Sequence, residues 1–263
     1  MKKLLYTTVI LSLIFSVTIS SCKKKAPAIP PESTFVMPKM DSTNTKSTSV
    51  GYGNFLTAFG HVAVWTTIIE VGLIVPKSAF VAALKQTPKY LGDSKWVWEY
   101  QVNIGFKTYV IQLYGTTANK KEIRWDMYVS SGEVKEFLWF YGVQNEEGNQ
   151  GYWIIYKSPT ENHELLRIDW TRDEANNTGT LKYTNIEPEG AENGGYIEYG
   201  NNLTGLYNCF YNIYNKGQDK TVNINYNTST HIGRIKAEHL LFDQNWHCWN
   251  QYFLDDYCPD TAK

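Results

Sequence analysis

The stretch from Trp96 to Ile104 reads Trp-Val-Trp-Glu-Tyr-Gln-Val-Asn-Ile and decides the fold class. Every second position carries a large apolar or aromatic side chain, and three of the four residues between them are polar. This period of two is that of a β-strand with one buried face. Aromatic and β-branched residues also favour strands, because they fit a pleated surface.

The same alternation recurs along the rest of the chain, with turn-rich clusters of Gly, Asn and Ser between the repeats. Matching stretches are 109–113, 123–129, 137–143, 166–170, 207–213 and 222–226. Between residues 90 and 256 the only prolines are Pro159 and Pro188, both in turn clusters, as a hydrogen-bonded sheet requires. We predict a mainly β fold, an antiparallel meander of about 10–12 strands that forms either a half-barrel or a closed up-and-down barrel.

An apolar stretch of 21 residues, 55–75, precedes the strands. Its apolar residues recur at helical spacing, which predicts a helix packed on the sheet, although its Val, Ile and Thr content also allows a strand. Its length would suffice to cross a membrane. His61 and Glu70 within it favour a buried helix of a soluble domain instead, and a second short helix is expected over 77–86.

Composition excludes some functions. The chain has 263 residues, with 25 Lys+Arg against 26 Asp+Glu and a formal net charge of -1. A nucleic-acid-binding protein would carry a clustered basic surplus, so we expect no nucleic-acid partner. With 43% apolar and 15% aromatic residues, the chain has enough apolar surface for a packed core.

The N-terminus indicates export. Lys2 and Lys3 precede an apolar run over 4–19, which is the pattern of a secretory signal peptide. The run ends in Ile19-Ser20-Ser21-Cys22, which resembles the bacterial lipobox. The resemblance implies cleavage after residue 21 and attachment of diacylglycerol and a further acyl chain, such as palmitate, to Cys22. Removal of Lys2 and Lys3 would lower the formal net charge from -1 to -3.

No acidic residue follows Cys22 directly. This is similar to lipoproteins that are sent to an outer membrane, so we expect a cell-envelope protein held at that membrane by its lipid anchor. Whether it faces the periplasm or the exterior stays open. Residues 22–50 contain four prolines and a Ser/Thr/Asn/Lys-rich run without apolar periodicity. We therefore predict a lipidated Cys with a disordered tether over 22–50 and a single β-rich domain over 51–263.

Two further resemblances concern the domain. The order of a helical opening followed by an aromatic-rich meander is similar to the half-barrel lipoproteins of the lipoprotein-sorting (Lol) pathway. The Trp-x-Trp-x-Tyr strand after a helical opening also looks like uncharacterised lipoproteins of Bacteroidota. The first resemblance implies an apolar cavity between sheet and helices, and the second implies no chemistry.

Three cysteines remain after Cys22. Export to an oxidising compartment predicts one disulfide and one free thiol. The pair Cys248–Cys258 closes the shortest loop and is favoured, while pairing of Cys209 with either one stays open.

No motif points to catalysis. The chain lacks a Gly-rich phosphate loop, a Gly-x-Ser-x-Gly elbow and a His-Glu-x-x-His motif. The histidines at 231, 239 and 247 are eight residues apart, unlike the close pairs of zinc sites. We predict no catalytic residue, no metal site and no cofactor.

Tryptophans on the predicted strands are the remaining candidates for a binding site. They are Trp96, Trp98, Trp125, Trp139, Trp153 and Trp170. The simplest interpretation places them in the core. Phe140 and Trp153 fall out of phase with their neighbours, however, which predicts a second aromatic surface.

Three functional hypotheses follow. The favoured one is a non-catalytic lipoprotein that holds an apolar ligand or a lipidated partner in its half-barrel. A glycan-binding accessory lipoprotein or glycoside hydrolase, with exposed aromatic platforms, is the alternative. A purely structural interaction module is the third.

Overall fold

A single antiparallel sheet dominates the structure, a computed structural model that describes residues 25–41, 51–119, 121–132 and 134–259. Within these residues fourteen strands follow one another in chain order, each paired with the next. They are β1 (Lys89–Gly92), β2 (Lys95–Ile104), β3 (Lys107–Asn119), β4 (Glu122–Ser131), β5 (Val134–Asn145), β6 (Gln150–Tyr156), β7 (Glu164–Asp173), β8 (Thr178–Asn185), β9 (Tyr196–Gly200), β10 (Cys209–Asn215), β11 (Lys220–Tyr226), β12 (Gly233–Lys236), β13 (His247–Trp249) and β14 (Asp255–Asp256).

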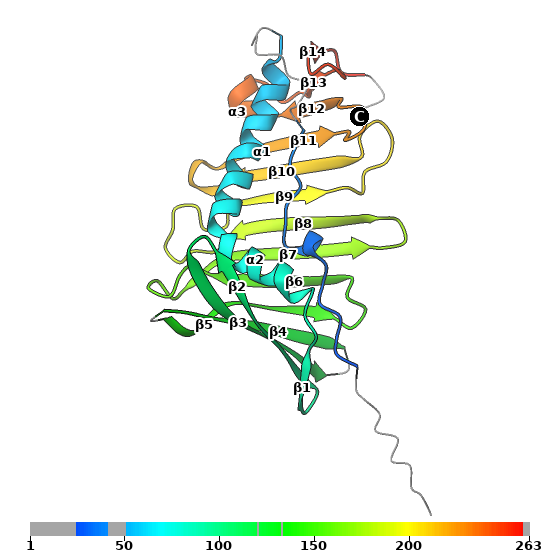
Figure 1. Cartoon of the computed structure of the whole chain (residues 1–263). Coiled ribbons are helices and arrows are strands. Elements are labelled where there is room, and N and C mark those ends of the chain that lie inside the picture. The colour runs from blue at the N-terminus through cyan, green and yellow to red at the C-terminus, as the bar shows by residue number, and fades with distance from the viewer. Residues whose placement is uncertain (1–24, 42–50, 120, 133, 260–263) are drawn as a thin grey trace, which may run out of the picture.

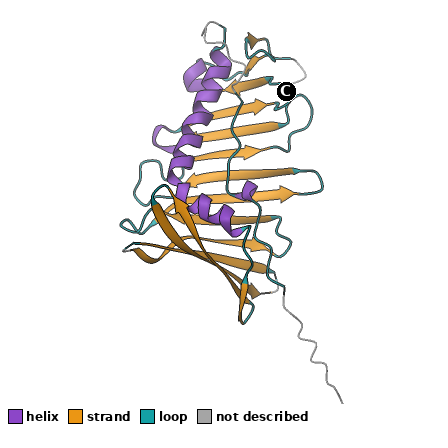
Figure 2. Cartoon of the chain, viewed as in Figure 1, coloured by secondary structure: helices purple, strands orange, loops and turns teal. Residues whose placement is uncertain are grey.

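The sheet stays open. Its edge strands β1 and β14 have four and two residues, and no ladder joins them within the described part of the chain. Such short edges offer little backbone for pairing with another chain. The helices all lie on one face of the curved sheet (Figures 1 and 2). The prediction of a mainly β antiparallel meander with an N-terminal helix is confirmed. Of the two predicted forms, a half-barrel and a closed barrel, the open form is the one found.

Helix α1 (Gly53–Gly72) runs across the concave face of the sheet at its C-terminal end. It buries Phe55, Ala58, Val62, Thr66 and Ile69, which recur at helical spacing. Its first backbone N–H groups, at Gly53 and Asn54, donate to the carboxylate of Asp255 over 3.2 and 2.8 Å. An acceptor at this end satisfies amides that have no partner within the helix.

Helix α2 (Ile74–Ala83) follows almost directly and packs on β2. Pro76 lies within its first turn, where the missing N–H costs no helical hydrogen bond. The second helix therefore begins before Pro76, three residues earlier than predicted. By length and composition alone α1 could cross a membrane, yet one of its faces is buried against β12, β13 and β14.

Residues 25–41, here called the N-terminal segment, correct the prediction of a disordered tether. The segment lies along the concave face beside α1 (Figure 1) and buries Phe35, Met37 and Met40. Periodicity did not reveal this burial, because an extended segment places single side chains into separate pockets of a surface that is already formed. The predicted signal peptide, the lipobox and the rest of the tether, 42–50, lie outside the described residues.

Cys248 and Cys258 form a disulfide with a Cα–Cα distance of 5.1 Å, the pairing that the sequence favours. It joins β13 to the chain that follows β14. Cys209 is a free thiol, fully buried, and burial raises its pKa to about 12. The thiol is therefore protonated at neutral pH and is a weak nucleophile.

Candidate binding groove on the concave face

The concave face of the sheet and the two helices enclose a groove, here called the concave groove, which the N-terminal segment fills. Phe35 is 1% exposed. Its ring stacks on Phe80 of α2 at 5.1 Å between centroids and contacts Phe140 and Trp153 of the sheet at 5.5 and 6.3 Å. Aromatic pairs at these separations stabilise beyond the area that they bury. Met37 and Met40, both 5% exposed, belong to the same core cluster.

Side chains of the sheet bind the backbone of the segment. The hydroxyl of Tyr183 donates to the carbonyl of Phe35 over 2.7 Å, and that of Tyr211 to the carbonyl of Pro38 over 3.2 Å. The amide of Gln144 donates to the carbonyl of Ala28 over 3.2 Å. These three donors come from β5, β8 and β10, so they follow the segment across much of the sheet.

Burial keeps the two tyrosine donors protonated. Desolvation raises the pKa of Tyr183 and of Tyr211 far above its usual value. A buried hydroxyl that found no acceptor would be costly, and here the segment supplies the acceptor.

The segment does not extend the sheet. Within residues 25–41 the backbone–backbone hydrogen bonds are local, from Thr34 to Pro31 and from Phe35 to Glu32, around the 3-10 turn η1 (Glu32–Thr34). Between described residues, no backbone–backbone hydrogen bond joins it to a strand. Apolar side chains in pockets and carbonyls held by side chains are also how a protein binds an extended peptide.

Five of the six candidate tryptophans lie in the core, with exposed fractions of 0–5%. Three of them pack against a glycine that is their direct partner on the neighbouring strand: Gly115 beside Trp125, Gly142 beside Trp153 and Gly151 beside Trp170. A Cβ at Gly142 would lie 2.3 Å from Trp153 Cε3, so only glycine leaves room for this ring. The rings fill the space above glycines, an arrangement that restores packing at those positions.

The sixth, Trp139, is half-buried, and a β-bulge explains its position. Met127 of β4 pairs with Phe140, and the next residue, Tyr128, pairs with Leu138, so Trp139 has no partner in the β4–β5 ladder. The bulge also turns Phe140 inward, where it is fully buried, as is Trp153 with 1% exposed. The prediction that Phe140 and Trp153 line a second aromatic surface is therefore wrong. The bulge resets the alternation for Phe140, and Trp153 of β6 faces inward like Ile155 two positions along.

The cavities beside the segment are small. One of about 10 Å³ lies between the segment and α1, lined by Phe35, Met37, Thr66 and Ile69 among others. Another of about 260 Å³ lies where the segment meets the β7–β8 turn, with Thr34, Trp170 and Tyr199 in its lining. The place where the sequence predicts a ligand cavity is thus largely occupied by the chain itself.

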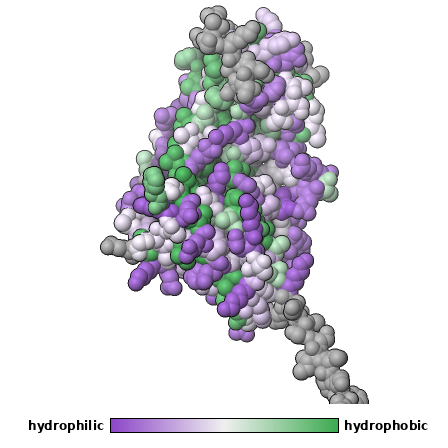
Figure 3. All heavy atoms as spheres, viewed as in Figure 1, coloured by the Kyte–Doolittle hydropathy of each residue, from purple (hydrophilic) through white to green (hydrophobic). Residues whose placement is uncertain are grey.

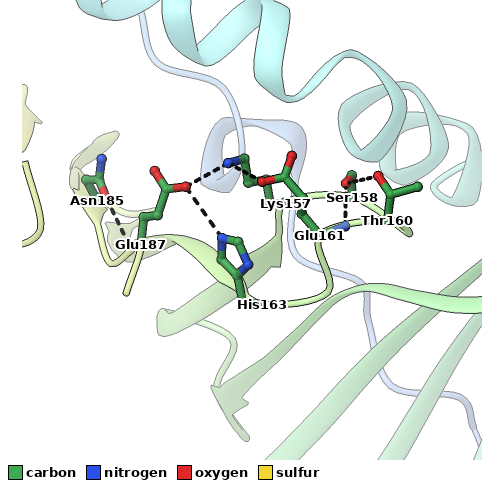
Figure 4. A network of polar contacts seen from close by, with 7 residues as sticks. All are labelled: Lys157, Ser158, Thr160, Glu161, His163, Asn185 and Glu187. Atoms are coloured by element: carbon green, nitrogen blue, oxygen red, sulfur yellow. Dashed lines mark hydrogen bonds and ion pairs between the residues drawn. The ribbon is translucent and has the colours of Figure 1, made fainter. Parts of the chain in front are cut away.

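An ionic cluster joins the β6–β7 loop to the chain after β8 (Figure 4). The ammonium of Lys157 lies 2.6 Å from a carboxylate oxygen of Glu161 and 2.8 Å from one of Glu187. His163 Nε2 lies 3.5 Å from Glu187 Oε1. The pKa of Glu187 is lowered, chiefly by the hydrogen bond from Lys157.

Glu161, His163 and Glu187 bring three potential ligand atoms within 4.8 Å of one another. A divalent cation would have to displace the ammonium of Lys157, which already pairs with both carboxylates. The cluster is best described as an internal ion pair that fixes two loops relative to each other.

The outer face of the sheet is polar and carries a shallow groove of about 400 Å³, here called the outer groove. Tyr152, Asp169, Lys182 and Glu198 are among its lining residues. The guanidinium of Arg167 lies 4.2 Å from the ring centroid of Tyr152 and pairs with Asp169. The outer groove thus combines an aromatic ring with carboxylates and an ammonium.

A scan against protein-family models, a search of curated proteins and a search of solved structures each found no match to this chain. The assignment of function therefore depends on the geometry of the chain's own residues.

Sequence reasoning missed Phe35 of the segment and the three residues that bind the backbone of the segment, Gln144, Tyr183 and Tyr211. A weak signal was present, since large apolar residues at 35, 37 and 40 are unusual in a proline-rich spacer. The side chains that donate hydrogen bonds to the segment could not be found by pattern, because they lie more than 100 residues further along the chain.

Proposed function

We propose that this protein is a non-catalytic binding protein of the cell envelope, anchored to the outer membrane through a lipidated Cys22. Its concave groove would bind an extended apolar segment of a partner protein, including the N-terminal segment of another lipoprotein. The observation that carries the proposal is the way in which the groove holds residues 25–41. Every contact is of a kind that a separate peptide could make.

Specificity in such a groove has two sources. The aromatic pocket formed by Phe80, Phe140 and Trp153 selects a large apolar side chain. The hydroxyls of Tyr183 and Tyr211 bind backbone carbonyls, so they fix the path of a peptide without selecting its sequence. In this proposal the chain's own segment protects the groove until a partner displaces it.

The test uses the full chain with a specific protease site introduced between residues 42 and 50. After cleavage, a fluorescent synthetic peptide with the sequence of residues 25–41 is added, and exchange is followed by fluorescence anisotropy. We expect saturable exchange. A matched peptide with Phe35→Ala should bind about 10²–10³-fold more weakly, because loss of a buried Phe costs about 3–5 kcal/mol.

Two results would contradict the proposal. If the cleaved segment never exchanges while the protein stays folded, the segment is a permanent part of the core. If extraction and native mass spectrometry instead reveal a stoichiometric lipid in the groove of the cleaved protein, the ligand is an acyl chain and not a peptide.

A second candidate function is glycan binding at the outer groove, favoured by its combination of Tyr152 with Asp169 and Glu198. Aromatic rings pack against sugar rings, while carboxylates accept hydrogen bonds from sugar hydroxyls. Titration calorimetry with cell-wall oligosaccharides would test it. Binding that is abolished by Tyr152→Ala but unchanged by Tyr183→Phe would place the ligand on the outer face.

A further inference from the structure

Helix α1 presents a second apolar face, on the side away from the sheet. Five large apolar side chains on this side are between 40% and 72% exposed. They are Leu56, Val64, Ile68 and Val71 of α1 and Ile74 at the start of α2. Val64, Ile68 and Val71 recur at helical spacing and form one stripe, here called the α1 stripe. A helix on the surface of a soluble domain normally carries polar residues on this side, and contiguous apolar surface of this kind marks an interaction site. Apolar residues gather along the flank where α1 runs (Figure 3).

The two helices carry a small basic surplus. Residues 53–86, which hold α1 and α2, include two lysines, Lys77 and Lys85, and a single acid, Glu70. Glu70 is already paired with Lys39 of the N-terminal segment, 2.8 Å away. The α1–α2 region thus has one basic side chain more than acidic ones, although the chain as a whole has a formal net charge of -1.

The described chain begins at the end of the N-terminal segment that lies away from α1, where Lys25 adjoins Thr117, Glu122 and Gln144 of the sheet. The ion pair between Lys39 and Glu70 places the N-terminal segment beside α1 on the concave face. The segment is held in the groove from Ala28 onward, and Lys25 is its first described residue. Lys25 is only three positions after Cys22, which is about 10 Å of extended chain. An acylated Cys22 would keep the body within that distance of the bilayer.

A further exposed aromatic residue follows α3. The α3 turn (Glu238–Leu241) ends at Phe242, which is 92% exposed. The pKa of His239 in this turn is lowered, first by desolvation and then by the charge of His61 of α1.

We propose that the α1 stripe docks on an anionic lipid bilayer, with the helix lying in the plane of the membrane surface. One face of α1 packs on the sheet, and the other enters the interface between headgroups and acyl chains, with lysines close to the anionic headgroups. The orientation of the folded domain relative to the membrane depends on the lipid anchor of the proposed function. The affinity of the stripe for lipid depends neither on that anchor nor on the concave groove.

The test uses the chain from residue 22 onward with Cys22→Ser, so that binding cannot come from acylation. Binding is measured by co-sedimentation with vesicles of phosphatidylcholine containing 30% phosphatidylglycerol. We expect the triple variant Val64→Ser, Ile68→Ser and Val71→Ser to lower the partition coefficient about 10²–10³-fold. These side chains are exposed, so the variant should fold normally by circular dichroism. A matched control, Val110→Ser with Leu206→Ser, removes apolar residues that are each 39% exposed and should leave binding unchanged.

Several outcomes separate this inference from its alternatives. A fluorophore at position 68, introduced as Ile68→Cys, should shift to the blue with these vesicles. If the triple variant binds vesicles as well as the parent does, the inference is overturned. If instead the parent forms dimers in sedimentation analysis that the triple variant abolishes, and vesicles do not bind, the occupant is a second copy. Failure here leaves peptide exchange in the concave groove unchanged, so the two proposals fail separately.

Discussion

Truncation of Phe35 should release the N-terminal segment without unfolding the sheet. The side chain is 1% exposed and stacks on Phe80 at 5.1 Å. Buried Phe→Ala substitutions cost about 3–5 kcal/mol. The segment has no backbone ladder to the strands, so this cost should fall on its own attachment. At 1.4 kcal/mol per tenfold, release should become roughly 10²–10³ times more populated.

Trypsin cleavage after Lys39 measures this release. Lys39 is followed by Met40, which is 5% exposed, so the backbone here cannot enter a protease while the segment is bound. When opening is fast relative to cleavage, the rate follows the population of the open form. We expect Phe35→Ala to accelerate cleavage at this bond by the same factor by which it raises the population of the released form. The cleavage rate is measured by mass spectrometry.

The matched control is Val36→Ala, one position along. Val36 is half-buried and lies outside the core cluster, so its truncation should accelerate cleavage by less than tenfold. Cleavage of the Phe35→Ala protein at the parent rate would refute the reasoning. Cleavage of both proteins only at the rate of global unfolding would also refute it, because the segment would then leave the groove only when the whole protein unfolds.

Four other substitutions test the framework. Gly142→Ala should destabilise the fold by about 3 kcal/mol in urea unfolding, since its Cβ would meet a ring and a backbone oxygen at 2.3 and 2.4 Å. Gly60→Ala, in a helix with open space, should instead stabilise it by about 0.5–1 kcal/mol, and equal effects would contradict the packing argument. Tyr183→Phe should speed tryptic release about tenfold, because a buried carbonyl loses its donor; no change would mean that water replaces the hydroxyl. Cys258→Ser should lower Tm by about 5–10 °C through loss of roughly 2.5–3 kcal/mol, and an unchanged Tm would mean that the C-terminal loop adds no stability.

Local pattern predicts the sheet well, because alternation is a property of neighbouring residues. The strand over 96–104 sets the fold class, and the turn clusters set the order of a meander in which each strand pairs with the next. Pattern cannot detect a bulge, however. One extra residue, Trp139, shifts the phase of β5 and makes Phe140 look like part of another surface.

The groove could not be predicted, because its contacts join residues far apart in sequence. Phe35 stands in a proline-rich stretch whose composition indicates disorder, and composition ignores what a preformed surface can bind. Its pocket requires Phe80 from a helix and Trp153 from a strand to lie together. The core position of three tryptophans likewise depends on glycines of the neighbouring strand, which leave room for their rings.

The central claim is that residues 25–41 occupy a binding groove and can leave it while the sheet stays folded. Thiol labelling under native conditions, without reductant, tests this in protein carrying Cys22→Ser and Met37→Cys. Cys209 is fully buried and serves as the internal reference for global unfolding. We predict that the thiol at position 37 reacts orders of magnitude faster than Cys209. Equal rates for the two thiols would contradict the account, because the segment would then be released only when the whole protein unfolds.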